Sequence, residues 1–170
     1  MNTQVHEVFR RSEGRYLNDQ ESQTLLTYAE NLLAQLDTMQ ALERAEATII
    51  EEVVRAVGQA YPDMSKDHGA IARDLVRRDQ TMLLRYASFG ALLQDKNFIY
   101  DKLAVWLRTI LFALCDVRQV VFGMKALLEA CNKHLSPVDA ERVVGHIAVV
   151  LTEFETNMQG AVPAGKGQAA

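Results

Sequence analysis

The sequence predicts an all-α protein, and three observations lead to that fold class. Hydrophobic residues make up 49% of the 170 residues and aromatic residues only 7%, a balance typical of helical domains. Apolar residues recur at intervals of three and four, and no segment alternates apolar and polar residues over any length. The prolines, Pro62, Pro137 and Pro163, fall outside the periodic segments. We therefore expect uninterrupted helices that enclose one core.

The N-terminal segment predicts a helical hairpin. Residues 1–14 form a short amphipathic pattern that stops at Gly14. The apolar side of this helix carries Val5, Val8 and Phe9. Asn18 or Asp19 can cap the next helix. Its apolar residues, at helical spacing, are Leu25, Leu26, Ala29, Leu32, Leu33 and Leu36.

Three features organise the middle of the chain. Asp37-Thr38 offers a cap for a third helix, which closes at residues 61–63. The apolar stripe of that helix is Leu42, Ala45, Ile49, Val53, Ala56 and Val57. Residues 63–69 are polar and predict a loop. A long helix then follows over residues 70–93.

The C-terminal half predicts three more helices. A break at residues 95–97 precedes a helix over residues 98–114, and the next covers residues 116–133. The last helix starts at Ser136-Pro137-Val138-Asp139, with serine as the cap and proline at the first helical position, and ends near Glu155. The whole pattern amounts to seven or eight helices with short loops.

Composition and charge exclude several classes of protein. A net charge of -4 and a pI near 5.6 argue against nucleic-acid binding, which usually needs a basic excess. The most apolar stretch, residues 103–114, is interrupted by Arg108, so no membrane span is expected. Arg10 and Arg11 lie where a signal peptide would need apolar residues. Two cysteines without motif spacing fit a reduced, cytoplasmic protein without a disulfide.

The segment that points to a function lies in the long helix over residues 70–93. It contains Arg78-Asp79 and, six residues after the aspartate, Arg85-Tyr86-Ala87-Ser88-Phe89. This pattern resembles the pigment-binding helix of the phycobiliproteins, light-harvesting proteins of the allophycocyanin and phycocyanin type. Further segments, in the same order and with nearly ungapped spacing, extend the resemblance over most of the chain: Gly14 to Leu17, Ala47 to Val54, Met124 to Ala126 and Val138 to Glu141.

The resemblance implies a specific architecture. The family fold is a globin-like helical core with an N-terminal two-helix extension that serves dimer formation. We therefore expect a domain over residues 1–157, with residues 1–36 as its extension. Residues 158–170 are expected to form a disordered tail, because residues 161–170 are rich in glycine, alanine and proline.

The resemblance also implies a pigment site, with one decisive change. In the family, a cysteine two residues before the arginine binds a linear tetrapyrrole (bilin) covalently, and here that position is Val76. Arg78 and Asp79 hold the positions that contact a propionate and the inner pyrrole nitrogens, with Arg77 beside them. We expect any bilin to bind non-covalently. An alternative register at residues 71–74 needs five inserted residues and contains no cysteine.

Other departures from the family concern the pocket and the partner contact. Met82 and Leu83 replace a Tyr-Tyr pair, and the loop over residues 63–69 is shorter than the family's lid. The resemblance places Arg85 and Tyr86 against a partner subunit, either a second copy or a phycobiliprotein-like chain. The acidic residue that pairs with this partner aligns with Arg11, so Glu13 would replace it, with Tyr16 nearby.

Simpler interpretations stand beside these predictions. Arg78-Asp79 can be solvated charge, with Asp74 and Arg78 paired at i,i+4. Heme binding is disfavoured, because a globin needs a histidine within residues 98–114 and the histidines are His6, His68, His134 and His146. Cys115 and Cys131 are expected to be buried. Trp106 is expected in a core stripe with Leu103, Ile110 and Leu114.

Three functions remain open at this point. No catalytic triad, phosphate loop or metal-ligand cluster is visible, so we expect no enzymatic activity. The first function is that of a phycobiliprotein-like assembly protein with non-covalent bilin binding. The second is a globin-like sensor domain that binds a small apolar ligand. The third is a structural interaction module whose pocket is filled by Val76, Met82 and Leu83.

Overall fold

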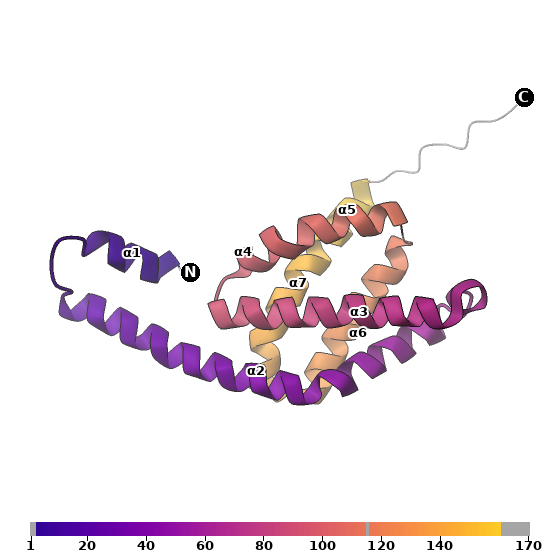
Figure 1. The fold of residues 1–170 in the computed structure, drawn as a ribbon, viewed down its shortest axis with the longest axis horizontal. Helices are drawn as coiled ribbons and strands as arrows, with labels where there is room; N and C mark the ends of the chain where they lie inside the picture. The colour runs from indigo at the N-terminus through magenta and orange to yellow at the C-terminus, as the bar shows by residue number, and fades with distance from the viewer. Residues whose placement is uncertain (1–2, 115, 161–170) are drawn as a thin grey trace, which may run out of the picture.

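The computed structural model describes residues 3–114 and 116–160, and in these residues it contains helices and no strand (Figure 1). The elements in order are α1 (Thr3–Arg11), α2 (Asp19–Ala60), α3 (Met64–Leu93), α4 (Lys96–Ile99), the π-helical turn η1 (Tyr100–Ala104), α5 (Val105–Leu114), α6 (Val117–His134) and α7 (Pro137–Gly160). The prediction of an all-α fold is confirmed.

The helices form a bundle from which the N-terminal hairpin projects. α3 packs along the C-terminal half of α2, while α6 and α7 pack on each other and cross these two helices (Figure 1). The continuous segment of α4, η1 and α5 lies on the other side of α3 (Figure 1). α1 folds back on the N-terminal half of α2, beyond the bundle. None of the helices formed by the described residues is long and apolar enough to cross a membrane.

Helix α2 is a single helix of 42 residues, roughly 60 Å long. The predicted start at Asn18 is confirmed, since Asn18 Oδ1 accepts from the Glu21 backbone N–H and Glu21 Oε2 accepts from that of Asn18. The predicted break at Asp37-Thr38 is wrong. The Thr38 hydroxyl caps no helix but donates to Asp139 Oδ1 of α7 at 2.7 Å and accepts from Arg142 Nη1 at 2.8 Å. The long helix is thus tied to α7 at its middle.

Two other boundaries differ from the sequence prediction. α3 begins at Met64, so the predicted loop over residues 63–69 is helical from its second residue. Polar residues do not prevent a helix, and Gly69, the residue of lowest helix propensity there, costs about 1 kcal/mol. α3 ends at Leu93, its C-cap residue Gln94 has the left-handed conformation, and Asp95 then caps α4 by accepting from the Asn97 N–H. The next helix therefore starts before residue 98.

The C-terminal predictions agree more closely. Asp116 caps α6, and the Ser136 hydroxyl accepts from the Asp139 N–H at the start of α7. α7 runs to Gly160, past the predicted end at Glu155, so the first residues of the expected tail are helical. Residues 161–170, and the rest of that prediction, lie outside the described residues, as does Cys115.

The core lies between α2, α3, α5, α6 and α7. Its fully buried large side chains are Phe154, Ile49, Leu83, Leu84, Ile99, Leu103, Met124, Leu127, Ile147, Val53, Val57 and Val143. The ring of Phe154 packs on that of Phe112 with centroids 5.6 Å apart. Cys131 is buried as predicted, and burial raises the pKa of its thiol to about 12. Trp106, predicted in the core, is 54% exposed on α5 instead.

The apolar stripe at the start of α2 remains uncovered in the chain by itself. Val5 and Val8 of α1 are buried, but Phe9, predicted on the same side, is exposed. The stripe residues Leu26, Leu33 and Leu36 are also exposed, Leu33 by 65%. Exposed leucines therefore gather along the projecting hairpin instead of entering the core of the bundle.

α3 and α7 approach closely where Gly90 faces His146. A Cβ atom at position 90 would lie 2.7 Å from His146 Nδ1, closer than real contacts allow. His146 is 5% exposed, and its Nδ1 has no hydrogen-bond partner in the described part of the chain. This contact requires glycine at position 90.

We predict that Gly90→Ala destabilises the protein by about 1–3 kcal/mol, because the added methyl group forces α3 and α7 apart. Gly58→Ala is the matched control, since a Cβ there meets no atom within 4 Å. The control should stabilise α2 by about 0.5–1 kcal/mol. Urea unfolding of both variants tests this, and equal effects would show that the contact between α3 and α7 is loose.

His146 also predicts a pH dependence of stability. Burial lowers the pKa of His146 below its ordinary value of 6.5, with Lys96 acting in the same direction and Asp95 opposing. The unfolded chain therefore binds a proton first as pH falls. The free energy of unfolding should be highest above pH 6.5 and decrease as the pH falls from 6.5 toward the folded-state pKa.

The measurement is urea unfolding between about pH 5 and 8. His146→Gln should flatten the pH dependence, whereas His6→Gln, at an exposed histidine of α1, should keep it. Identical pH profiles for the two variants would exclude His146 as the source.

Candidate functional site

Helix α3 distributes the motif residues between two hollows. One face directs Val76, Asp79 and Leu83 into a cavity between α2, α3, α5 and α6. Another carries Arg78, Met82 and Tyr86 on the wall of an open groove along α3 and α4. Neighbouring positions on a helix point about 100° apart, so residues adjacent in the motif enter different spaces.

The cavity has a volume of about 290 Å³. Its lining residues are Val57, Ala72, Leu75, Val76, Asp79, Gln80, Leu83, Leu107, Leu111, Asp116, Gln119, Val120, Gly123 and Met124. Most of these side chains are apolar, and the charged ones are both aspartates. A mostly apolar pocket with a few polar groups is the usual form of a small-molecule site.

Asp79 lines the cavity and forms an ion pair with Arg78, which lines the groove. Its side chain is mostly buried, and Oδ1 accepts from Arg78 Nε at 2.8 Å and lies 2.7 Å from Arg78 Nη2. Asp116, the other aspartate of the lining, accepts from Arg118, and this hydrogen bond lowers the pKa of Asp116. Each carboxylate of the lining therefore has an arginine partner beside an apolar space.

Gln80 is a cavity residue that the sequence analysis missed. It is only 6% exposed, and its Oε1 has no hydrogen-bond partner among the described residues. Its amide group lies against α6, where a Cβ at Gly123 would be 2.9 Å from Nε2. The available signal was its place in the helix, four residues after Val76 and three before Leu83, where the stripe is otherwise apolar.

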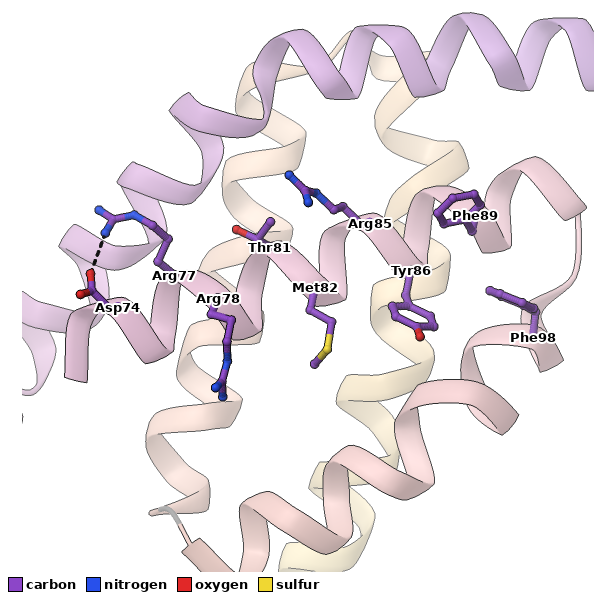
Figure 2. Close-up of a pocket in the computed structure, with 9 residues that line it drawn as sticks. All are labelled: Asp74, Arg77, Arg78, Thr81, Met82, Arg85, Tyr86, Phe89 and Phe98. Carbon is purple, nitrogen blue, oxygen red and sulfur yellow. Dashed lines mark hydrogen bonds and ion pairs between the residues drawn. The ribbon is translucent and has the colours of Figure 1, made fainter. Parts of the chain in front are cut away.

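The groove is wider, with a volume of about 890 Å³ (Figure 2). It is lined by Asp74, Arg77, Arg78, Thr81, Met82, Arg85, Tyr86, Phe89 and Phe98. Figure 2 shows Arg77 and Arg85 pointing toward α2, while Arg78, Met82 and Tyr86 point to the other side of α3. The rings of Tyr86 and Phe98 stack at a centroid distance of 6.3 Å.

The groove arginines already have partners within the chain. Arg85 Nε and Nη2 donate to the two carboxylate oxygens of Glu46 on α2, at 2.8 and 2.6 Å. Arg77 pairs with Glu51 on α2 and with Asp74. The predicted pair of Asp74 with Arg78 is therefore wrong, since Arg78 binds Asp79. These exposed pairs contribute little stability, but they orient the guanidinium groups.

A comparison with protein families decides the identity of this architecture. A family model described as phycobilisome protein matches residues 11–156. The chain belongs to the phycobilisome protein family. No curated protein matches the chain significantly. The resemblance drawn from the motif in α3 is confirmed, and the bundle with its projecting hairpin is the globin-like fold of phycobiliproteins with an N-terminal helical extension.

In this phycobilisome family protein, the predicted pigment residues separate into two groups. Val76 and Asp79 line the cavity, whereas Arg77 and Arg78 line the groove, and the ion pair between Arg78 and Asp79 connects the groups. Val76 presents no thiol to the cavity, because position 76 is valine.

The predicted interface residues also separate. Arg85 and Tyr86 line the groove, whereas Glu13 and Tyr16 lie in the turn between α1 and α2, at the far end of the hairpin (Figure 1). Tyr16 is 98% exposed. Arg11 pairs with Glu7 of its own helix at 2.7 Å. One copy of the chain cannot bring these two groups together, so a contact between them requires a second subunit.

No histidine belongs to the lining of the cavity or of the groove. His134 is partly buried, and its Nε2 lies 2.7 Å from Glu52 Oε2. Lys133 binds the same carboxylate, and both partners lower the pKa of Glu52. Across the part of the chain that the structure describes, no three His, Cys, Asp or Glu side chains are grouped to hold a metal ion.

Proposed function

We propose that this protein is a non-enzymatic assembly subunit of the phycobilisome family that holds a linear tetrapyrrole without a thioether bond. One observation carries the proposal: Val76 and Asp79 line the same cavity. The resemblance aligns Val76 with the family's anchoring cysteine and Asp79 with the polar partner of the pigment, so the site would keep the carboxylate next to an apolar space and lack the thiol.

The donor and acceptor groups fit a tetrapyrrole. A carboxylate such as that of Asp79 accepts hydrogen bonds from pyrrole N–H groups, and the fork of a guanidinium matches a propionate. Arg77 and Arg78 lie on the groove side, so propionates would bind there while pyrrole rings enter the cavity. A cavity of about 290 Å³ is at the lower limit for ligand pockets, so it holds only part of the chromophore.

Two exposed surfaces of the chain, the N-terminal hairpin and the groove, support assembly with another subunit. The hairpin projects exposed leucines at positions 26, 33 and 36, and the groove offers aromatic side chains between arginines. We infer that the hairpin of one subunit docks on the α3–α4 groove of another, which is a second copy or a phycobiliprotein-like partner. Glu13 would then supply a carboxylate near Arg85, which is exposed despite its bond to Glu46.

We predict that the protein, produced together with a bilin-synthesising pathway, acquires a visible absorbance that is lost on denaturation. Asp79→Asn should weaken binding about 10–100-fold, because it removes an ionic acceptor, and Arg78→Ala should weaken it less, since Arg78 is exposed. Val76→Cys should allow covalent attachment of the bilin. The absorbance should then survive denaturation, and a denaturing gel should show a zinc-fluorescent protein band.

Absorbance titration and denaturing gels provide the measurement, with Arg55→Ala, at an exposed arginine of α2 that lines neither the cavity nor the groove, as the control. If Arg78→Ala and Asp79→Ala leave bilin binding unchanged, the site assignment is wrong. A colourless native protein would favour the ligand-free interaction module instead.

The assembly proposal predicts that Leu33→Glu dissociates the subunits, with a dissociation constant raised at least 30-fold, because a charge enters the apolar centre of the contact. Val138→Glu, at another exposed apolar position, on α7, is the control and should leave assembly unchanged. Sedimentation of the protein alone and with a co-expressed phycobiliprotein-like chain measures this. Equal sedimentation of both variants would contradict docking through the hairpin.

A further inference from the structure

Thr38 is the first residue of α2 that the rest of the fold buries. Its side chain is 1% exposed, whereas no side chain in residues 19–37, the half of α2 that belongs to the projecting hairpin, is classed as buried. The buried residues of the other half follow from Leu42 onward. Support of α2 by the bundle therefore begins at Thr38, and the direction of the hairpin depends on what happens there.

Two side chains from the start of α7 bind α2 at this point. The Thr38 hydroxyl donates to Asp139 Oδ1 at 2.7 Å and accepts from Arg142 Nη1 at 2.8 Å. The same nitrogen of Arg142 donates to the carbonyl oxygen of Ala34 at 2.9 Å. The Ser136 hydroxyl donates to Asp139 Oδ2 at 2.7 Å, which holds the carboxylate in place. Both α7 side chains thus reach α2 within one helical turn.

These contacts lie where α2 changes its course. Figure 1 shows the helix changing direction near its middle, where the start of α7 reaches it. Side-chain hydrogen bonds to helix carbonyl groups compete with the backbone ladder and often bend a helix. The carbonyl oxygen of Ala34 accepts from Arg142 and also lies 3.2 Å from the Thr38 hydroxyl. The residues that bend α2 are therefore bound by α7.

A second approach of the hairpin to the bundle is loosely packed. Gln94, which follows α3, and Tyr28 and Asn31 of α2 belong to the lining of a pocket of about 300 Å³. Gln94 Nε2 has no hydrogen-bond partner among the described residues. Close packing is what holds helices in one arrangement, and a pocket of this size leaves room for movement. The contact at Thr38 is thus the tighter of the two.

We propose that Thr38, Asp139 and Arg142 form a latch on a hinge in α2, and that this latch fixes the direction in which the hairpin presents Leu26 and Leu33. Without the latch, α2 bends differently at residues 34–38 and the hairpin samples several directions. The consequence for assembly rests on the proposed function. A hairpin that keeps the docking direction for about a tenth of the time binds its partner about tenfold more weakly.

The test measures distances between spin labels by pulsed electron double resonance. The labels are attached at Asp19→Cys, on the hairpin, and Thr109→Cys, on α5, both at exposed positions. The starting protein should give one narrow distance. Thr38→Val and Arg142→Leu should broaden or shift it by about 5 Å or more, because Asp19 lies roughly 28 Å along the helix from Thr38 and a swing of about 10° moves it that far. A second pair, Asp19 with Arg55, detects swings that leave the first distance unchanged.

Two features of the design keep the distances interpretable. Labelled chains are diluted in unlabelled protein, so that only distances within one chain are measured. Cys115 is replaced by serine, and Cys131 is buried with a pKa raised to about 12, which protects it from the label. Urea unfolding shows that each variant is folded.

Thr24→Val is the matched control. Thr24 also donates to the carbonyl four residues earlier in α2, at 2.9 Å, but its hydroxyl binds no group of α7. It also lines the pocket near Gln94, so the same variant tests the second contact of the hairpin. Thr38→Ser, which keeps the hydroxyl, should restore the distances of the starting protein.

Altered distances in Thr38→Val and Arg142→Leu, with Thr24→Val and Thr38→Ser unchanged, would support the latch. Sedimentation of the unlabelled variants then tests its consequence, with the dissociation constant expected to rise about tenfold. Altered distances with unchanged sedimentation would support the latch and contradict docking through the hairpin. Unchanged distances in both latch variants, or an equal change in Thr24→Val, would overturn the latch and leave the proposed function to its own test with Leu33→Glu.

Discussion

Helix α3 is packed against α2, α6 and α7, and its described side chains line two open spaces, the cavity and the groove. Its apolar face, which includes Leu83 and Leu84, is fully buried, so the helix cannot rotate without exposing the core. The directions of the two neighbouring faces of α3 are therefore fixed as well. Asp79 and Gln80 therefore enter the cavity, and Arg78 reaches the groove, because of where the leucines pack.

The electrostatics of the site follow from this arrangement. Asp79 lies beside an apolar space, where an isolated carboxylate would be unstable, and the guanidinium of Arg78 compensates for its desolvation from the groove side. Gln80 has no such compensation within the described residues. The cavity wall therefore includes one paired carboxylate and one buried glutamine whose amide oxygen is unpaired.

In the N-terminal hairpin, an apolar pattern in the sequence does not correspond to burial in the structure. Its apolar stripe has the pattern of a core helix, yet Leu26 and Leu33 are exposed. The stripe lies beyond the bundle, where the core of the same chain does not reach (Figure 1). Such a surface is stable in water only at a cost, and contact with another subunit removes that cost. The family membership and the exposed groove both support the proposed role of the hairpin in subunit assembly.

The sequence by itself determined the helical class, the caps at Asn18, Asp116 and Ser136, and the family motif, because periodicity and capping depend on residues within one turn of each other. The sequence also showed that position 76 is valine and not cysteine. Only the tertiary structure decided the continuity of α2, where Thr38 binds α7 instead of capping a helix. It likewise exposed Trp106 and buried Gln80. Burial depends on which distant helix packs on each face, and no local pattern contains that information.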